Sequence, residues 1–392
     1  MEMNFLRNQH LEETYGFRIN VTPSKDTNMS DLSKLLLAGD DTYDAVFPQV
    51  RNAAGCAQQG LLLDLKTLKY LDFESGYWSS MYNDTLSIMN RMFYATGDIS
   101  VNYRDSLFSI WFNKDMLSDY QLDDPYELVK SGKWTLDAIE SMSLAAAGDL
   151  DGDSAMTLKD RWGLVFQSSE SGIIFYYGAG EHVVDLDEEK KPYISLGGER
   201  STVVFDRISG MMSQTQAIKT MSDSDVSNTF MDSRSLFMAI VIYHLMTHRA
   251  QDVNFGLLPV PKYDEAQQDY YQFADGWCIS PACVPATAKN PETSGYILQA
   301  IAEASRKDVL PVYYDICLTR KYVRDEESSE MLDIIFKNCM LDNSDIFQWA
   351  SFDSALKTAF KKGEGLQSLL EKNRSKLEGG IEKTIAAFEE NT

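Results

Sequence analysis

The stretch Tyr43-Asp44-Ala45-Val46-Phe47 shows most directly how this chain is built. It follows leucines at 32–36 that share one helical face, so we expect a helix and then a short buried strand. Upstream, residues 5–15 have helical spacing, and apolar residues alternate with polar ones at 17–21 as in a strand. This alternation predicts an α/β fold with open, mostly parallel sheets and helices on both faces.

Later segments continue the alternation. An apolar strand ends at Asn113 where a helix begins, and Asp124 and Thr135 stand where helix N-caps are expected. We expect further strands and helices from the apolar runs and helical spacings, at 236–242, 255–258, 297–304 and 377–388.

The composition indicates a soluble globular protein. The 392 residues are enough for two lobes, with 44% hydrophobic and 24% charged residues. Because 59 acidic residues outnumber 36 basic ones, the net charge of −23 excludes nucleic acid and anionic lipid surfaces as expected partners. No run of about eighteen apolar residues indicates a membrane span.

Cysteine and histidine spacing gives little sign of a metal centre. The five cysteines are scattered without a Cys-x-x-Cys pair, and Cys278 and Cys283 are candidates for pairing only in an oxidising compartment. His244 and His248 are spaced for one helix face, but no third zinc ligand lies nearby.

Residues 149–160 have the spacing of a calcium-binding loop. Its first, third, fifth, seventh and twelfth positions are Asp149, Asp151, Asp153, Ala155 (through its carbonyl) and Asp160. The sixth residue is serine where glycine is usual, and the twelfth is shorter than the usual glutamate. We expect a structural Ca²⁺ and no catalytic cofactor; the alternative is an acidic surface turn with capping aspartates.

Catalytic motifs are missing, whereas aromatic residues are abundant. We find neither a Gly-x-Ser-x-Gly elbow nor a phosphate-binding glycine loop, and nothing selects a carboxylate pair among the acids. Sugar rings stack on aromatic planes, so aromatic residues at strand or loop ends are candidate ligand contacts, with core packing as the alternative. The candidates are Trp78, Trp111, Tyr243, Trp277 and Trp349.

Several segments resemble family 1 extracellular solute-binding proteins, the substrate receptors of ABC importers related to maltose-binding protein. The stretch at 43–47 is similar to a segment of this family, together with the later stretch Ala57-Gln58-Gln59-Gly60-Leu61-Leu62-Leu63-Asp64-Leu65. Similar stretches are 112–117, 124–135, the aspartate loop before Trp162-Gly163-Leu164, 255–262 and 321–328. Together they cover nearly the whole chain.

The resemblance implies a two-lobed periplasmic-binding-protein type II fold that closes about a hinge. The expected N-terminal lobe is 1–108 plus 262–309 and the C-terminal lobe is 109–261 plus 310–392. Chain crossings are then expected near Ser109, Pro261 and Leu310.

The resemblance also suggests ligand-binding residues. The loop after the strand at 44–47 offers Gln49, Arg51 and Asn52, but it lacks the family's aromatic residue. Asp105 matches an acid before the hinge strand. Tyr243, Trp277 and Trp349 fall on or near aromatic positions of the family.

Solute-binding relatives begin with a signal peptide, a lipid-anchored cysteine and a first β-strand, and we expect that strand to be missing from this chain. The family implies an extracellular location, either periplasmic or lipid-anchored, and a monomer that delivers its solute to ABC permease subunits. We expect a non-enzyme that binds a neutral solute, a sugar or oligosaccharide. The alternatives are a carbohydrate-active hydrolase and a ligand-sensing subunit of a membrane signalling system.

Overall fold

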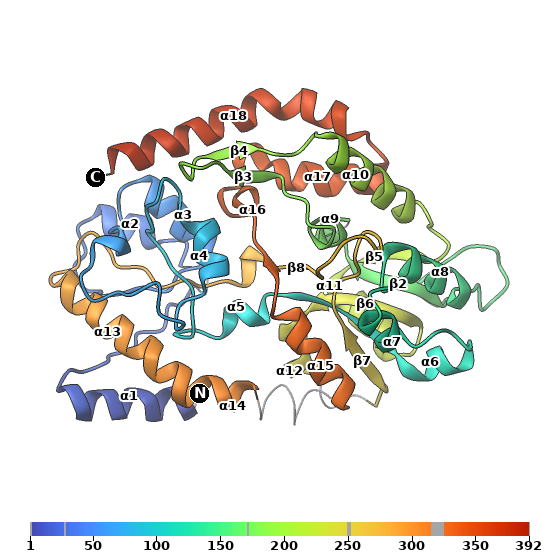
Figure 1. The fold of residues 1–392 in the computed structure, drawn as a ribbon, viewed down its shortest axis with the longest axis horizontal. Helices are drawn as coiled ribbons and strands as arrows, with labels where there is room; N and C mark the ends of the chain where they lie inside the picture. The colour runs from blue at the N-terminus through green and yellow to red at the C-terminus, as the bar shows by residue number, and fades with distance from the viewer. Residues whose placement is uncertain (1, 27–28, 171, 249–251, 315–324, 392) are drawn as a thin grey trace.

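The computed structural model describes residues 2–26, 29–170, 172–248, 252–314 and 325–391. Its elements form two lobes (Figure 1). Helices α1–α5, α13 and α14 make up the N-terminal lobe, and a sheet with its covering helices makes up the C-terminal lobe. None of the described helices combines the length and the apolar character needed to cross a membrane. The resembling stretch at 321–328 begins outside the described residues, where Cys317 also falls.

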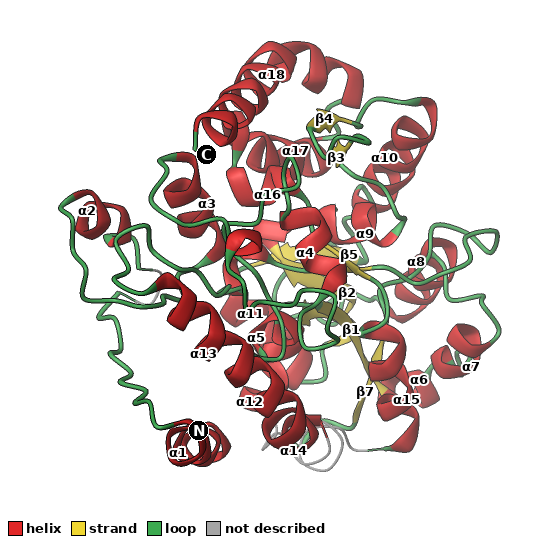
Figure 2. Cartoon of the chain, turned by 60° about the vertical axis from the view of Figure 1, so that its left-hand side comes forward, coloured by secondary structure: helices red, strands yellow, loops and turns green. Residues whose placement is uncertain are grey.

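The C-terminal lobe is built on a five-stranded sheet in the order β5-β2-β6-β1-β7. The strands β5, β2 and β6 are parallel, and β1 runs antiparallel to both β6 and β7. Every residue of β1, β2, β6 and β7 is buried, because helices cover both faces (Figure 2). The predicted α/β class with open sheets is confirmed. The strands are β1 (Phe108–Asn113), β2 (Trp162–Gln167), β5 (Ile218–Met221), β6 (Ser235–Val241) and β7 (Phe255–Leu258).

Three helices of this lobe begin at the positions that their capping residues predicted. Asn113, Asp124 and Thr135 each accept a hydrogen bond from a backbone N–H in the first turn of the helix that follows. The helices are α6 (Lys114–Asp119), α7 (Pro125–Lys130), α8 (Leu136–Ala146), α9 (Ile173–Gly178), α10 (Glu199–Met212), α11 (Asp223–Met231), α12 (Leu245–His248) and α15 (Glu326–Ile335).

The N-terminal lobe has few paired backbone segments. Within the described ranges its backbone forms isolated bridges such as Val46–Cys283 and Ala95–Ala282, so the expected strand at 44–47 is reduced to one bridging residue. Its helices are α1 (Glu2–Tyr15), α2 (Leu32–Leu37), α3 (Val50–Gln58), α4 (Ser80–Leu86), α5 (Asn102–Asp105), α13 (Pro291–Ala304) and α14 (Leu310–Val312).

The strand predicted at 17–21 is wrong. Residues 17–24 have no regular secondary structure, and Val21 is 73% exposed. The N–H of Ile19 donates to the Glu12 carboxylate, at 2.7 Å, instead of to a neighbouring strand. Alternating side chains do not make a strand unless another strand accepts their hydrogen bonds.

Three chain segments lie side by side where the lobes meet, and we call 106–108, 272–275 and 339–341 the crossing segments. Leu107 bridges Ala274, and Ala274 N–H donates to Met340 at 2.9 Å. Within them β8 (Gln272–Phe273) pairs with β9 (Cys339–Met340) in parallel. Of the three expected crossings, only Ser109 lies beside a crossing segment. Pro261 follows β7, and Leu310 begins α14.

The last part of the chain packs on both lobes. Helices α16 (Asn343–Phe347), α17 (Phe352–Lys362) and α18 (Leu366–Glu390) follow β9, and the hairpin of β3 (Val184–Leu186) and β4 (Pro192–Ile194) lies against α18. Helix α18 contacts α10 at one end and α3 at the other (Figure 1).

Substituting Gly163→Ala should destabilise the protein by at least about 2 kcal/mol. A Cβ at Gly163 would lie 2.1 Å from the Ser143 carbonyl oxygen, where α8 packs on β2. Thermal or urea unfolding measures the loss. Gly210→Ala, in α10 with no atom within 4 Å of the added Cβ, is the control and should be neutral or slightly stabilising. Equal melting of the two variants would contradict this packing.

Candidate ligand-binding site

A cavity of about 590 Å³ lies between the lobes. The lining residues on the N-terminal side are Arg51, Asp275, Trp277 and Cys278. Residues 167–170, Tyr243 and α17 line it from the other side. Its volume is in the range of small-molecule sites, and a ligand inside it would contact both lobes.

Exposed aromatic side chains stand on both walls of the cavity. Trp277, in the short helix η4 (Gly276–Cys278), is 56% exposed, and Tyr243, just after β6, is 47% exposed. The Arg51 guanidinium lies 5.7 Å from the centre of the Trp277 ring. Large aromatic surfaces facing a cavity provide planes on which a sugar ring can stack.

Buried hydrogen bonds hold the N-terminal wall in place. Gln49 caps α3 by accepting from Arg51 N–H at 3.0 Å, and its amide donates to Gly276 O at 3.1 Å. One Asp345 carboxylate oxygen accepts from Arg51 at 2.7 Å, and the other accepts from Gly276 N–H at 3.1 Å. Burial lowers the pKa of Arg51, but the charge and hydrogen bond of Asp345 together with the charges of Asp275 and Asp353 outweigh it and raise the pKa.

The C-terminal wall contains a buried cluster of two acids and one lysine. Lys357 Nζ lies 2.8 Å from Glu170 Oε2 and 2.8 Å from Asp353 Oδ2, and the residues are 9%, 7% and 3% exposed. Burial raises the pKa of Glu170 to about 8 and that of Asp353 to about 6, although Lys357 opposes both shifts. One lysine does not fully offset the desolvation of two carboxylates, so both pKa values stay raised.

This cluster can accept hydrogen bonds from a ligand. Within the described residues, Asp353 Oδ1 has no hydrogen-bond partner although it is buried. Glu170 and Asp353 both line the cavity, so ligand hydroxyl groups can donate to them.

The predicted site residues divide into two groups. Arg51, Tyr243 and Trp277 line the cavity, and Gln49 lies buried beneath its wall. Asn52 is in α3 but is not part of the lining.

The other four candidates are not among the residues that line this cavity, and their role as ligand contacts stays a prediction. Trp111 is fully buried and stacks on Phe255 at 4.7 Å between ring centres. Trp349 is buried and donates to Thr384, and Asp105 accepts from the Tyr313 hydroxyl. Burial raises the pKa of Asp105 to about 6. The fourth, Trp78, lines a different, smaller cavity.

Sequence reasoning missed the acid–lysine cluster. A signal was present in α17, because Asp353 and Lys357 fall on the same buried face as Leu356 and Phe360. Charged residues on an apolar helical face are seldom tolerated unless they are paired, and such a pair is a candidate for function.

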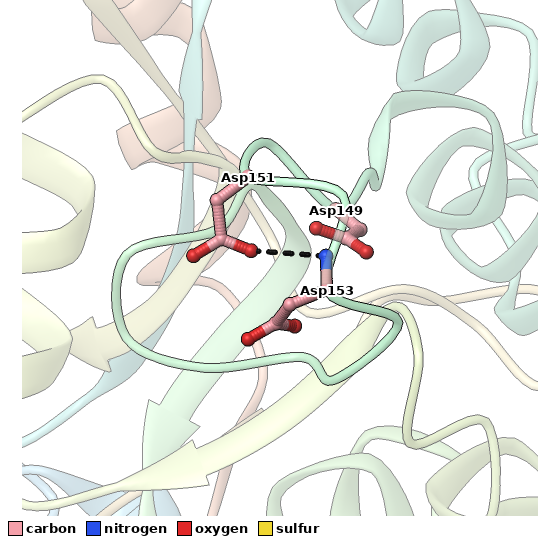
Figure 3. Close-up of side chains that lie close together, drawn as sticks. All are labelled: Asp149, Asp151 and Asp153. Carbon is pink, nitrogen blue, oxygen red and sulfur yellow. Dashed lines mark hydrogen bonds between the residues drawn. The ribbon is translucent and has the colours of Figure 1, made fainter.

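The aspartate loop lies apart from the cavity and brings together three of its five expected ligands. Carboxylate oxygens of Asp149, Asp151 and Asp153 lie within 4.8 Å of one another and are exposed (Figure 3). Asp160 is buried, and its carboxylate accepts from the N–H groups of Leu150 at 2.9 Å and Thr157 at 2.6 Å, which lower its pKa. The three converging carboxylates offer the hard oxygens that Ca²⁺ prefers.

The two candidate disulfide cysteines, Cys278 and Cys283, are both free thiols. Cys278 lines the cavity, and burial raises its pKa to about 12.

Comparison with known proteins supports the fold at low sequence identity. No family model matches the sequence, and no curated protein matches it. Among solved structures, a cyclo/maltodextrin-binding protein complexed with maltotetraose is similar over 99% of this chain and 93% of its own, with a TM-score of 0.65 and 11% identity.

Other solved structures agree. A sugar transporter protein from Rhizobium etli, in an open conformation, is similar over 98% of this chain and 95% of its own, with a TM-score of 0.64 and 14% identity. An ABC substrate-binding protein from Listeria monocytogenes in complex with cycloalternan matches over 98% and 96%, with a TM-score of 0.63 and 12% identity. The chain therefore has the two-lobed fold of ABC-transporter sugar-binding proteins, as its sequence motifs predicted.

Substituting Glu170→Gln should raise the melting temperature above pH 8 by about 2 °C and leave it nearly unchanged at pH 5. The folded pKa of Glu170 is raised from 4.5 to about 8, so folding takes up a proton between these values. Wild-type stability therefore falls as pH rises through this window, and neutral glutamine removes that cost.

Melting curves of wild type and variant from pH 5 to pH 9 test this expectation. Glu127→Gln, at an exposed position in α7, is the control and should give curves parallel to wild type. A Glu170→Gln curve parallel to wild type would show that Glu170 is not protonated in the folded state.

Proposed function

We propose that this protein is the solute receptor of an ABC importer and that its ligand is a neutral carbohydrate, a sugar or an oligosaccharide. The observation that carries the proposal is the cavity between the lobes, with Trp277 exposed on one wall and Tyr243 on the other. The solved structures with this fold that are named as binding maltotetraose and cycloalternan support the same ligand class.

The charges in the cavity favour a neutral ligand over an anionic one. Arg51 is paired with Asp345, and Lys357 is paired with two acids. An anionic ligand that bound Arg51 or Lys357 would have to displace these buried carboxylates, which would leave them unpaired. The third basic side chain of the lining, Lys361, donates to the Ser168 carbonyl. The four acids that share the lining with it are Glu170, Asp223, Asp275 and Asp353. A hydroxylated ligand needs no such exchange, because it can donate to Asp353 and Glu170 and stack on the aromatic walls.

Ligand capture would work by closure of the lobes. Because the cavity is lined from both sides, a bound sugar gains its full set of contacts only when the lobes are close together. The crossing segments are the natural hinge, since they are the paired backbone segments at the junction. In this proposal the closed monomer is extracellular, periplasmic or lipid-anchored, and it delivers the solute to permease subunits without catalysis.

Trp277→Ala and Tyr243→Ala should each weaken carbohydrate binding by about tenfold or more, because each removes a stacking plane. A thermal-shift screen of mono- and oligosaccharides, including maltotetraose and cycloalternan, would find the ligand, and calorimetry would measure its affinity. Tyr193→Ala in β4, exposed and outside the cavity lining, is the control. Unchanged affinity in both cavity variants would place binding elsewhere.

The buried acid pair gives a reason to test the hydrolase alternative directly. Glu170 and Asp353 have raised and different pKa values, which is a property of acid–base pairs in glycosidases. Labelled oligosaccharide incubated with the protein should be recovered unchanged. Turnover that is lost in Glu170→Gln would replace the receptor proposal with a hydrolase, and coupling to a membrane kinase rather than a permease would favour the sensor alternative.

We also propose that the loop at 149–160 binds a structural Ca²⁺ through Asp149, Asp151 and Asp153. Chelator should then lower the melting temperature by a few degrees while leaving carbohydrate affinity nearly unchanged, because the loop does not line the cavity. Calcium-dependent melting of wild type, compared with Asp151→Asn, measures the effect. A melting temperature that changes with neither calcium nor chelator would show that the loop is an ordinary acidic turn.

A further inference from the structure

A second cavity, of about 240 Å³, lies at the junction of the lobes and shares no lining residue with the first. Residues of α4 and α5 line it, together with Leu107 and Cys339 from two crossing segments. Figure 1 shows α4 and α5 beside the junction and α15 next to it. Nothing in the proposed carbohydrate binding uses this cavity.

Arg104 in the lining of this cavity is a cation with incomplete bonding. Its guanidinium lies over the rings of Tyr103, at 5.1 Å, and Phe336, at 5.4 Å. Its ion pair with Asp98 is 3.9 Å long, beyond hydrogen-bond distance, and its side chain is only 19% exposed. Among the described residues, its Nε is buried without a hydrogen-bond partner. Buried polar groups are almost always satisfied, so this guanidinium is an exception that needs a cause.

Asp98 compensates the charge of Arg104 only in part, because its two carboxylate oxygens already accept hydrogen bonds from other groups. Arg306 Nη1 binds one oxygen at 2.9 Å, and the Tyr103 hydroxyl donates to the other at 3.2 Å. Two arginines thus share one carboxylate around the cavity. This leaves local positive charge in a protein whose net charge is −23.

The rest of the lining combines aromatic and apolar side chains with the polar residues Ser79 and Ser80. The aromatic and apolar residues that line the cavity with the arginines are Trp78, Met81, Tyr82 and Phe336. A carboxylate complements a guanidinium fork with two parallel hydrogen bonds, and a flat apolar body complements aromatic walls.

We propose that this cavity is a second ligand site that takes a small aromatic carboxylate, with the carboxylate on Arg104 and the ring among the aromatic residues of the lining. The site is separate from the carbohydrate cavity. Two crossing segments line the site, so a bound ligand would contact the backbone segments that connect the lobes.

Benzoate is the probe, and its neutral isostere benzamide and inorganic phosphate are the comparisons. Calorimetric or NMR titration should give a Kd for benzoate at least about tenfold lower than for benzamide, since a charge-assisted hydrogen bond depends on the carboxylate charge. It should also be lower than the Kd for phosphate, which has no ring to bury. Binding of benzoate no tighter than that of either comparison would overturn the proposal.

Variants assign the binding to this cavity. Arg104→Gln should raise the Kd for benzoate at least about tenfold, and Arg104→Lys, which keeps the charge but not the planar fork, should raise it less. Trp277→Ala, in the carbohydrate cavity, and Arg234→Gln, beside Asp232 at the surface, should leave it unchanged. Circular dichroism and melting verify that each variant is folded, and Arg104→Lys keeps the test valid if Arg104→Gln does not fold.

Equal benzoate affinity in folded wild type and either Arg104 variant would overturn the proposal. Loss of benzoate binding in Trp277→Ala would do the same, because it would place the probe in the carbohydrate cavity. The outcome does not depend on the carbohydrate proposal, since no sugar is present in these titrations.

Discussion

The wall of the larger cavity between the lobes depends on one buried carboxylate, that of Asp345. This side chain, with no exposed surface, accepts from Arg51 at the start of α3 and from the backbone of Gly276 at the start of η4. It thereby fixes the positions of the two residues, Arg51 and Trp277, that shape the N-terminal wall. A Cβ on Gly276 would lie 2.5 Å from this carboxylate, so glycine is required there for close approach. Removing the carboxylate would take away the ion-pair partner of Arg51 and the acceptor of the Gly276 N–H, and so would release both residues from their positions.

Much of the C-terminal lobe was predictable because its signals are local. Caps at Asn113, Asp124 and Thr135 begin their helices without help from distant residues, and the apolar runs of β6 and β7 are long enough to identify buried strands. The prediction of a strand at 17–21 was wrong, although its alternating pattern is also a local signal. A strand must pair with a second strand, and a single sequence does not reveal whether that second strand is present. The same holds for the isolated bridges of the N-terminal lobe.

Only some residues of the candidate site were predictable from the sequence. Burial separates the predicted aromatic residues that line the cavity from those that do not. Trp277 and Trp111 carry the same side chain, yet one is 56% exposed on a cavity wall and the other is fully buried in the sheet. Only the three-dimensional packing separates these outcomes. The cluster of Glu170, Asp353 and Lys357 brings together residues almost two hundred positions apart, and the sequence contains no direct sign of that meeting beyond the buried charges of α17.

Helix α18 has a consequence for how far the lobes can move. It contacts α10 in one lobe and α3 in the other, where Gln58 donates to Thr384 at 2.7 Å and Asn391 donates to Ala57 O at 2.9 Å. A rotation of the lobes must either carry the whole helix with one of them or break one set of these contacts. In the proposed closure, these contacts of the C-terminal helix would limit the rotation of the lobes together with the crossing segments.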